Sequence, residues 1–297
     1  MDRIEIIKKW IKIHLNQYFT IESASSDASF RRYFRVISNN KTYILMDAPP
    51  QLEKIEHFVN ITHKLVNAEI KVPELISFDI KLGLILMTDF GSKTFLDVLD
   101  NKNSYELYPK AIHSLLKIQT KVDTKGLQDY SEKFLISEMS LFTEWYLKNL
   151  KDFKHEDQDS LNKIFSLISK KTLTQNKCFV HRDYHSRNLM FIPECDPGIL
   201  DYQDAVVGPL TYDLVSLLKD AYIEWDEDFV LDQSVRYWEK AKKAGLIKNK
   251  DFSSFYEDFE WMGVQRHLKI LGIFSRLSIR DKKNQYLNSM PLVEKYL

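Results

Sequence analysis

Two carboxylates and one carboxamide in this chain stand at spacings that suit phosphoryl transfer. Asp183 is followed by Asn188 five residues later and by Asp201 thirteen residues beyond Asn188. Phosphoryl transfer from a nucleotide needs a carboxylate that accepts the proton of the attacking hydroxyl, and oxygen ligands for the metal ions that bridge the phosphates. We therefore predict that all three residues are catalytic, with Asp183 as the base and with Asn188 and Asp201 as ligands of Mg²⁺ beside ATP.

The segment from His181 to Asn188 also matches a known loop pattern. It reads H-R-D-x-x-x-x-N, the pattern of the protein-kinase catalytic loop, and Asp201 follows at the interval of the metal-binding Asp. Short apolar runs precede and follow the segment, as strands would. The alternative is a polar surface loop in which Asp183 caps a turn and Asn188 satisfies backbone groups. The joint spacing in a strand-loop-strand setting favours the catalytic interpretation.

A second kinase-like triplet lies in the wrong place for a metal site. Asp89-Phe90-Gly91 spells the magnesium-binding triplet of protein kinases, but it precedes the catalytic loop instead of following it. It follows the apolar run 84–87 and precedes the helix-like run 94–99. We therefore expect a hinge between two lobes, in which backbone groups near Met87 and Asp89 meet the adenine edge.

The expected phosphate-binding turn has an unusual composition. Residues 25–32 stand where kinases have a glycine-rich turn, and they contain no glycine. Small Ser and Ala residues could still form a tight anion-binding turn, and Arg31 or Arg32 could supply charge to the phosphates. A surface turn with solvated arginines is the alternative.

The lysine that contacts the α and β phosphates in kinases has no counterpart here. Met46 or Asp47 stands at its position, at the end of an apolar run. Either an arginine of the preceding turn compensates, or the chain is a degenerate kinase that binds its ligand without turnover. Glu53 or Glu56, which would pair with that lysine, is then a candidate partner for one of the arginines.

Candidates for substrate binding lie in and after the catalytic loop. Arg187 stands beside the predicted base, where it either anchors the loop or meets an anionic group. Glu224 and Trp225 could bind a sugar through a carboxylate and an aromatic plate, or form a helix end packed on the core. Asp213, near a predicted helix start, is expected to cap backbone N–H groups and to brace the catalytic loop.

Size and composition exclude several classes of protein. The 297 residues are 44% hydrophobic and 28% charged, which indicates a globular chain with one large or two modest domains. The 42 basic and 42 acidic residues balance, so no global charge attracts nucleic acid or an anionic membrane. No stretch approaches the roughly 18 apolar residues of a membrane span, and the N-terminal segment lacks a signal peptide's apolar core. We therefore expect a cytoplasmic protein.

The predicted elements indicate an α+β fold with two lobes, like that of protein kinases. Residues 1–90 mix helix and strand and are expected to form a small β-rich lobe that binds the nucleotide. Residues 91–297 are expected to form a larger helical lobe with the catalytic loop and the substrate site. The remaining elements are predicted as a helix from about Ile4 that packs on the protein's own core, a hairpin of 32–37 and 42–46 with an Asn turn, a helix at 51–68, strands at 74–79 and 83–88, and helices at about 104–122, 131–150, 159–175, 211–223, 227–244, 252–279 and 282–290.

These motifs together resemble the aminoglycoside phosphotransferase and choline kinase superfamily. The segments 26–35, 45–50 and 181–188 are similar to one branch, the bacterial anomeric kinases of N-acetylmuramate and N-acetylglucosamine in cell-wall sugar recycling. The resemblance covers about residues 20–225. It implies ATP-dependent phosphorylation of the C1 hydroxyl of the sugar, and it implies that the replacement of lysine around Met46 is inherited.

Three other functions stay open on the sequence. An aminoglycoside-modifying enzyme would need an acidic pocket, for which the carboxylates of residues 226–228 are candidates. A kinase of another small alcohol, such as choline or homoserine, would share the same loop. A nucleotide-binding pseudokinase would bind ATP without transfer. The expected partners are thus a nucleotide and a small molecule, and the sequence leaves the oligomeric state open.

Overall fold

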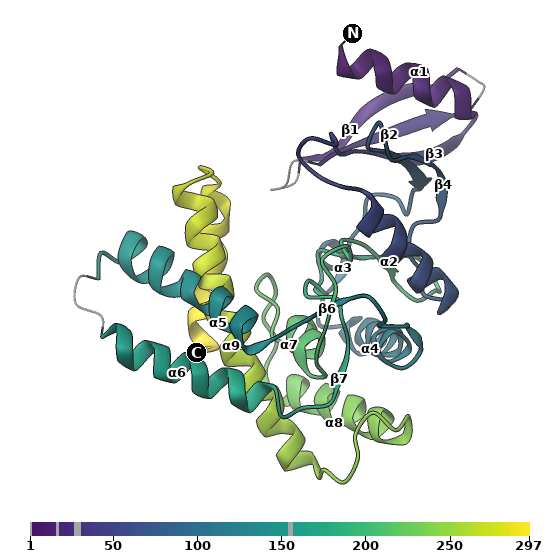
Figure 1. Ribbon diagram of the computed structural model, residues 1–297. Helices are drawn as coiled ribbons and strands as arrows, with labels where there is room; N and C mark the ends of the chain where they lie inside the picture. The colour runs from purple at the N-terminus through teal and green to yellow at the C-terminus, as the bar shows by residue number, and fades with distance from the viewer. Residues whose placement is uncertain (1, 16–17, 27–30, 154–156) are drawn as a thin grey trace. The chain divides into compact units, whose positions relative to one another are not determined.

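The computed structural model describes residues 2–15, 18–26, 31–153 and 157–297 and divides into two units (Figure 1). The first unit comprises Met1–Ser92 and Gly198–Gln203, and the second comprises Lys93–Pro197 and Asp204–Leu297. The segment Gly198–Gln203 carries Asp201, so this residue belongs to the first unit although it lies far along the chain. The predicted division at residue 90 assigns this segment to the second lobe, because the sequence does not show that the chain returns to the first unit at Gly198.

The first unit contains an antiparallel sheet with the strand order β1-β2-β3-β5-β4. Its strands are β1 (Thr20–Ser26), β2 (Arg32–Ser38), β3 (Lys41–Asp47), β4 (Leu75–Asp79) and β5 (Leu84–Thr88). The predicted hairpin is confirmed, because Asn39 and Asn40 connect β2 to β3 with φ values of 48° and 58°. Asn tolerates this left-handed conformation better than most residues, which is why the pattern could be recognised.

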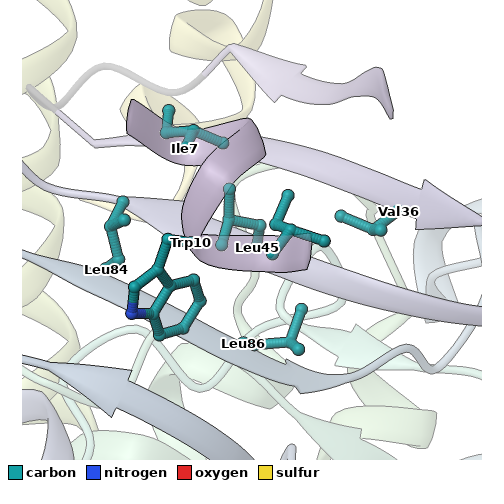
Figure 2. Close-up of a cluster of buried hydrophobic side chains, with 7 residues drawn as sticks. Ile7, Trp10, Val36, Leu45, Leu84 and Leu86 are labelled. Carbon is teal, nitrogen blue, oxygen red and sulfur yellow. The ribbon is translucent and has the colours of Figure 1, made fainter. Parts of the chain in front are cut away.

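Helix α1 (Arg3–Leu15) packs on this sheet, as its apolar spacing predicts. Figure 2 shows Ile7 and Trp10 of the helix among apolar side chains of the strands. The buried cluster consists of Ile7, Trp10, Ile11, Val36, Leu45, Leu84 and Leu86. Burial of these side chains fixes β3 and β5, the strands whose ends carry the unusual Met46-Asp47 pair and the predicted hinge.

Helix α2 (Glu56–Asn67) begins later than the predicted residue 51. Residues 51–55 instead follow Pro50 as turns, in which the N–H groups of Leu52 and Glu53 donate to the carbonyl of Pro49 at 2.8 and 3.1 Å. Leu52 suggested a helical spacing, but its side chain is 56% exposed. Glu53 therefore lies in the connection before the helix.

The second unit is mostly helical. Its α-helices are α3 (Phe95–Val98), α4 (Ser104–Lys121), α5 (Glu132–Leu141), α6 (Gln158–Thr172), α7 (Tyr212–Leu218), α8 (Glu227–Lys243), α9 (Phe252–Ile279) and α10 (Met290–Lys295). The predicted helices at 104–122, 159–175, 227–244 and 252–279 are confirmed with small differences at their ends. The part of the chain that the structure describes has no helix long and apolar enough to cross a membrane.

Three predicted helices differ from the structure. The helix expected at 131–150 changes at Phe142 from α5 into a π-helix, Phe142–Leu150. Helix α9 approaches the chain closely at this change, because a Cβ atom on Gly272 would lie 2.4 Å from the Leu141 carbonyl carbon. The segment expected at 282–290 is a 3-10 helix, Asn284–Ser289, followed by α10. Helix α7 ends at Leu218 and not at residue 223, because Asp220 turns toward the catalytic loop.

A small sheet supports the catalytic loop in the second unit. Strand β7 (Lys177–Val180) leads into the loop and pairs antiparallel with β10 (Val206–Pro209), and β10 pairs parallel with β6 (Gln128–Asp129). The short strands β8 (Leu189–Met190) and β9 (Gly198–Ile199) follow the loop along the chain. The register places Val180 opposite Val206, so the residue before His181 is held in regular structure.

Candidate active site

The predicted catalytic loop, residues 181–188, has as its second residue a strained Arg182 that Asp213 stabilises. Arg182 has φ 78°, a conformation that costs a residue with a side chain about 1 kcal/mol or more. The Asp213 carboxylate is fully buried and accepts hydrogen bonds from the backbone N–H groups of His181 at 2.7 Å and Arg182 at 3.0 Å. Burial raises the pKa of Asp213 to about 7, and these two hydrogen bonds act in the opposite direction. The predicted bracing role of Asp213 is confirmed.

Asp183 and Asn188 are linked within the loop. The Asn188 side-chain Nδ2 donates to the backbone carbonyl of Asp183 at 2.9 Å, and the Asp183 N–H donates to His181 Nδ1 at 3.2 Å. Because the amide nitrogen of Asn188 is held in this way, its Oδ1 atom is the one suited to bind a metal ion. The loop thus holds the backbone of the predicted base and the side chain of the predicted ligand together.

The charges around Asp183 favour its ionised form. Burial raises the pKa of Asp183, but the positive charge of Lys269 and those of cationic groups in the loop outweigh this effect. The pKa of Asp183 is therefore below its ordinary value. A carboxylate in this state can accept a proton at neutral pH, as a general base must.

Ser186 is held by an acidic residue that sequence reasoning missed. Asp220 Oδ2 accepts from the Ser186 N–H at 2.9 Å and from its hydroxyl at 2.5 Å, while Asp220 Oδ1 accepts from the Tyr222 N–H at 3.0 Å. The Ser186 carbonyl in turn accepts from the Leu96 N–H at 3.1 Å. Asp220 is fully buried, and the sequence carried no local signal for its role, since its contacts with Ser186 span 34 residues.

Asp201 is held within the first unit by its own neighbours. It has φ 62°, and its Oδ1 accepts a hydrogen bond from Gln203 Nε2 at 2.7 Å, so Gln203 orders the segment that follows β9. Tyr202 anchors the segment, because its ring stacks on Phe58 at 5.1 Å and its hydroxyl lies 2.9 Å from that of Thr62. The carboxylate is thus presented from a firmly packed turn.

Arg31 and Arg32 have different surroundings. Arg31 is 8% exposed, and its guanidinium lies 3.3 Å from Glu53 and 3.9 Å from Asp201. Glu53 therefore holds an arginine, as the missing lysine suggested. Residues 27–30 of the predicted phosphate-binding turn lie outside the described residues.

Arg32 instead neutralises the carboxylate that follows Met46. Its Nε and Nη2 atoms donate to Asp47 Oδ2 at 3.0 and 2.5 Å. Arg3 of α1 donates to Asp47 Oδ1 at 2.9 and 2.6 Å, and Asp47 itself is fully buried. The side chains at the position of the missing lysine are thus an apolar Met46 and a carboxylate clamped by two arginines.

The predicted hinge has a structural ion pair. Met87 lies in β5, between Ile44 of β3 and Leu75 of β4. The carboxylate of Asp89 accepts from Arg35 Nε at 2.6 Å and from the Gly91 N–H at 2.8 Å. Burial raises the pKa of Asp89, but these partners outweigh it and lower the pKa below its ordinary value. The Asp89 side chain serves the fold, and its backbone contact with adenine stays a prediction.

Comparison with known proteins identifies the family of this chain. Residues 20–246 match the model of the phosphotransferase enzyme family. The chain belongs to this family. It is 40% identical to the N-acetylmuramate/N-acetylglucosamine kinase of Pseudomonas aeruginosa, over 99% of this chain and 91% of that protein. It is 38% identical to the kinase of the same name from Neisseria meningitidis, over 100% and 90%.

The fold of this phosphotransferase is also found in solved structures. A choline kinase from Streptococcus pneumoniae superposes with a TM-score of 0.67 at 14% identity, covering 99% of each chain. The predicted α+β, protein-kinase-like fold is therefore confirmed. At this identity the likeness concerns the fold and not the acceptor.

The predicted substrate residues of the phosphotransferase have separate partners. The Arg187 guanidinium carbon lies 4.7 Å from the centroid of the Tyr222 ring. Trp225 Nε1 donates to the hydroxyl of the buried Tyr108 at 2.5 Å, whereas Glu224 forms an exposed ion pair with Lys295. Trp225 thus serves the helix-end packing that was the alternative to sugar binding. A sugar contact by Glu224 or Trp225 stays a prediction.

Proposed function

We propose that this phosphotransferase transfers the γ-phosphoryl group of ATP to the C1 hydroxyl of N-acetylmuramate or N-acetylglucosamine. The supporting observation is the loop of residues 181–188, in which Asp213 accepts a hydrogen bond from the backbone N–H of Arg182, the residue before the ionised Asp183. Asn188 donates to the backbone carbonyl of Asp183 in the same loop. The acceptor rests on the names of relatives that are 37–40% identical over nearly the whole chain. Because the donor is ATP, we place the reaction in the cytoplasm.

In this reaction Asp183 accepts the proton of the sugar hydroxyl as that oxygen attacks the γ-phosphorus, while the bond between the γ-phosphorus and the β–γ bridging oxygen breaks and ADP leaves. The loop contributes by holding the backbone of Asp183 in place before the substrate arrives, which lowers the entropic cost of reaching the transition state. Asp213 and Asp220 support the loop by accepting hydrogen bonds from the backbone N–H groups of Arg182 and Ser186, respectively.

Asn188 of the second unit and Asp201 of the first unit are the residues that would hold the magnesium ion of such a reaction. Magnesium prefers oxygen ligands, and Asn188 offers Oδ1 because its nitrogen is bonded to the Asp183 carbonyl. Asp201 offers a carboxylate that Gln203 and Arg31 orient. The ion, when bound, neutralises charge on the nucleotide phosphates.

Arg31 is our candidate for the cation that replaces the kinase lysine. It is buried beside Glu53 and Asp201, as a kinase lysine is paired with its glutamate. Arg32 is less suited, because Asp47 neutralises its charge. Met87 and the backbone of Asp89 are proposed to contact adenine, and Arg187 an anionic group of the acceptor or of the phosphates.

An ADP-release assay with a panel of acceptors tests this function. The purified chain is incubated with ATP, magnesium and, in turn, N-acetylmuramate, N-acetylglucosamine, an aminoglycoside and choline. We expect ADP release that depends on either sugar. Release with the drug or choline alone would assign a different acceptor, and ATP binding without release under every condition would indicate a pseudokinase.

A further inference from the structure

A buried cluster of charged side chains lies beside the catalytic loop in the second unit. Glu138 of α5 and Lys269 of α9 are 6% and 5% exposed, and Lys269 Nζ lies 3.2 Å from Glu138 Oε1. The same Glu138 oxygen forms an ion pair with Arg182 of the catalytic loop. Helices α5 and α9 pack against each other, so these side chains meet across a helix interface (Figure 1).

Each member of this cluster is further held by aromatic or polar groups. Tyr130 donates its hydroxyl hydrogen to Glu138 Oε2, and the tyrosine is fully buried. Lys269 Nζ donates to the hydroxyl of Tyr212 at 2.9 Å, and Tyr212 precedes the loop-bracing Asp213 in sequence. The Arg182 guanidinium carbon lies 5.1 Å from the centroid of the Phe134 ring.

The charges in the cluster do not balance without the predicted base. Arg182 and Lys269 bring two positive charges, and Glu138 brings one negative charge. Burying a surplus charge is unfavourable unless another group compensates it. The titratable and charged groups that act on Lys269 are Glu138 from α5, Tyr212 from α7, and Arg182 and Asp183 from the loop. Asp183 supplies the second negative charge, and with it the four groups are neutral.

We propose that Lys269 is a positioning residue of this phosphotransferase, which acts with Glu138 to fix Arg182 and to compensate the charge of Asp183. This proposal rests on the proposed function, because the reaction gives the loop its role. Lys269 joins the loop on one side through Glu138 and Arg182, and on the other through Tyr212 and the adjoining Asp213. Its removal would leave Arg182 paired with Glu138 but would take away a cation whose charge acts on the base.

Substitution of Lys269 with steady-state kinetics tests the proposal. Lys269→Met should lower kcat at least about tenfold while the KM values for ATP and sugar change less than about twofold, because a displaced base affects the transition state more than binding. Lys269→Arg, which keeps the charge, should recover most of kcat. The matched control is Lys171→Met, since Lys171 is an exposed lysine that also pairs with a glutamate of α9, Glu257.

Hydrogen exchange of the peptide that contains residues 181–188 gives a second measurement, which needs no sugar. Lys269→Met and Glu138→Gln should each speed the exchange of this peptide, and Lys171→Met should not. In the double variant of Lys269 and Glu138, the exchange rate should rise by less than the product of the two single effects, because the two side chains act on one loop.

The outcomes separate this proposal from the proposed function. If the unaltered chain transfers no phosphoryl group to either sugar, the proposed function fails, and the exchange measurement still decides whether Lys269 fixes the loop. The positioning role is overturned if Lys269→Met keeps kcat within about twofold with unchanged loop exchange. It is also overturned if the loss appears in KM alone, or if Lys269→Arg is as slow as Lys269→Met although both variants fold.

Discussion

The Asp213 carboxylate holds the backbone of Arg182 in a left-handed conformation through a hydrogen bond of 3.0 Å. A second bond from the His181 N–H at 2.7 Å completes the arrangement. The residue before the predicted base thus owes its strained geometry to a buried group 31 residues away along the chain. This relationship explains why the loop can present Asp183 and Asn188 together.

Removing this support should both destabilise the chain and slow the reaction. Asp213→Ala leaves two backbone N–H groups without their acceptor, and each such bond to a charged group contributes about 1.5 to 3 kcal/mol. We expect the free energy of unfolding to fall by at least about 2 kcal/mol, as measured by urea denaturation, and kcat to fall as well. An unchanged denaturation midpoint would show that Asp213 does not support the loop.

Asp183→Ala should nearly abolish turnover and leave nucleotide binding intact. General base catalysis contributes roughly 10²- to 10⁴-fold, so we expect kcat to fall by at least about 100-fold. The affinity for ATP, measured by calorimetry, should change little because the proposed role of Asp183 is with the acceptor. Turnover within about tenfold of the unaltered chain would contradict the assignment.

Asp201→Ala should remove the magnesium dependence of nucleotide binding. The substitution takes away a proposed carboxylate ligand, and a magnesium site bound by few protein ligands cannot readily lose one. Calorimetric titrations of ATP with and without magnesium should then give similar, weak affinities. If added magnesium still tightens ATP binding as in the unaltered chain, Asp201 is not a metal ligand.

Two neighbouring arginines provide a matched comparison for the missing lysine. Arg31→Met should raise the KM for ATP, by roughly tenfold, because a buried charged contact of about 1.4 kcal/mol or more is lost. Arg32→Met should leave that KM nearly unchanged and lower the free energy of unfolding by about 1 kcal/mol, since Arg32 is partly exposed and pairs with Asp47. Equal effects of the two substitutions on the KM for ATP would contradict the proposal that Arg31 contacts the phosphates and that Arg32 only pairs with Asp47.

Stability at low pH should depend on His267. Burial lowers the pKa of this imidazole to about 3, and its Nε2 lies 3.1 Å from the Lys219 carbonyl. The unfolded chain binds a proton near pH 6.5, whereas the folded chain does not until near pH 3. The free energy of unfolding therefore falls as the pH falls through this window, by up to about 1.4 kcal/mol per pH unit.

Replacing this histidine tests the sign of that effect. His267→Gln should flatten the pH dependence of the free energy of unfolding between pH 6.5 and 3, as measured by denaturant titrations at several pH values. His63→Gln, which changes an exposed histidine of the first unit, serves as the control. The same slope in both variants and in the unaltered chain would mean that the His267 imidazole is protonated in the folded state.

The sequence carried the local features of the fold and the site. The base and the amide could be found because one short loop contains both Asp183 and Asn188, and their spacing follows from the conformation of that loop. The hairpin was predictable because its two turn residues, Asn39 and Asn40, are of a type that accepts positive φ. The helix expected from residue 51 was placed too early because an exposed Leu52 continued the apolar spacing by chance.

The supporting contacts could not be read from the sequence because they join distant parts of the chain. Asp220 reaches Ser186 across 34 residues, and Arg3 reaches Asp47 across 44. Lys269 appeared only as one charged position in a long helix, although its side chain is buried against Glu138. Such partners are determined by tertiary packing, which hydrophobic periodicity and turn signals do not predict.

Product analysis by phosphorus-31 NMR asks whether the chain makes a sugar phosphate and whether Asp183 is required. The chain is incubated with ATP, magnesium and N-acetylmuramate or N-acetylglucosamine, beside the Asp183→Ala variant at equal concentration and with ATP binding verified. We expect the unaltered chain to form a 1-phosphate of the sugar in step with ADP, and the variant to form none at a comparable rate. Phosphate on another hydroxyl, no sugar phosphate at all, or equal product from both proteins would contradict the function and the role of Asp183 proposed for this phosphotransferase.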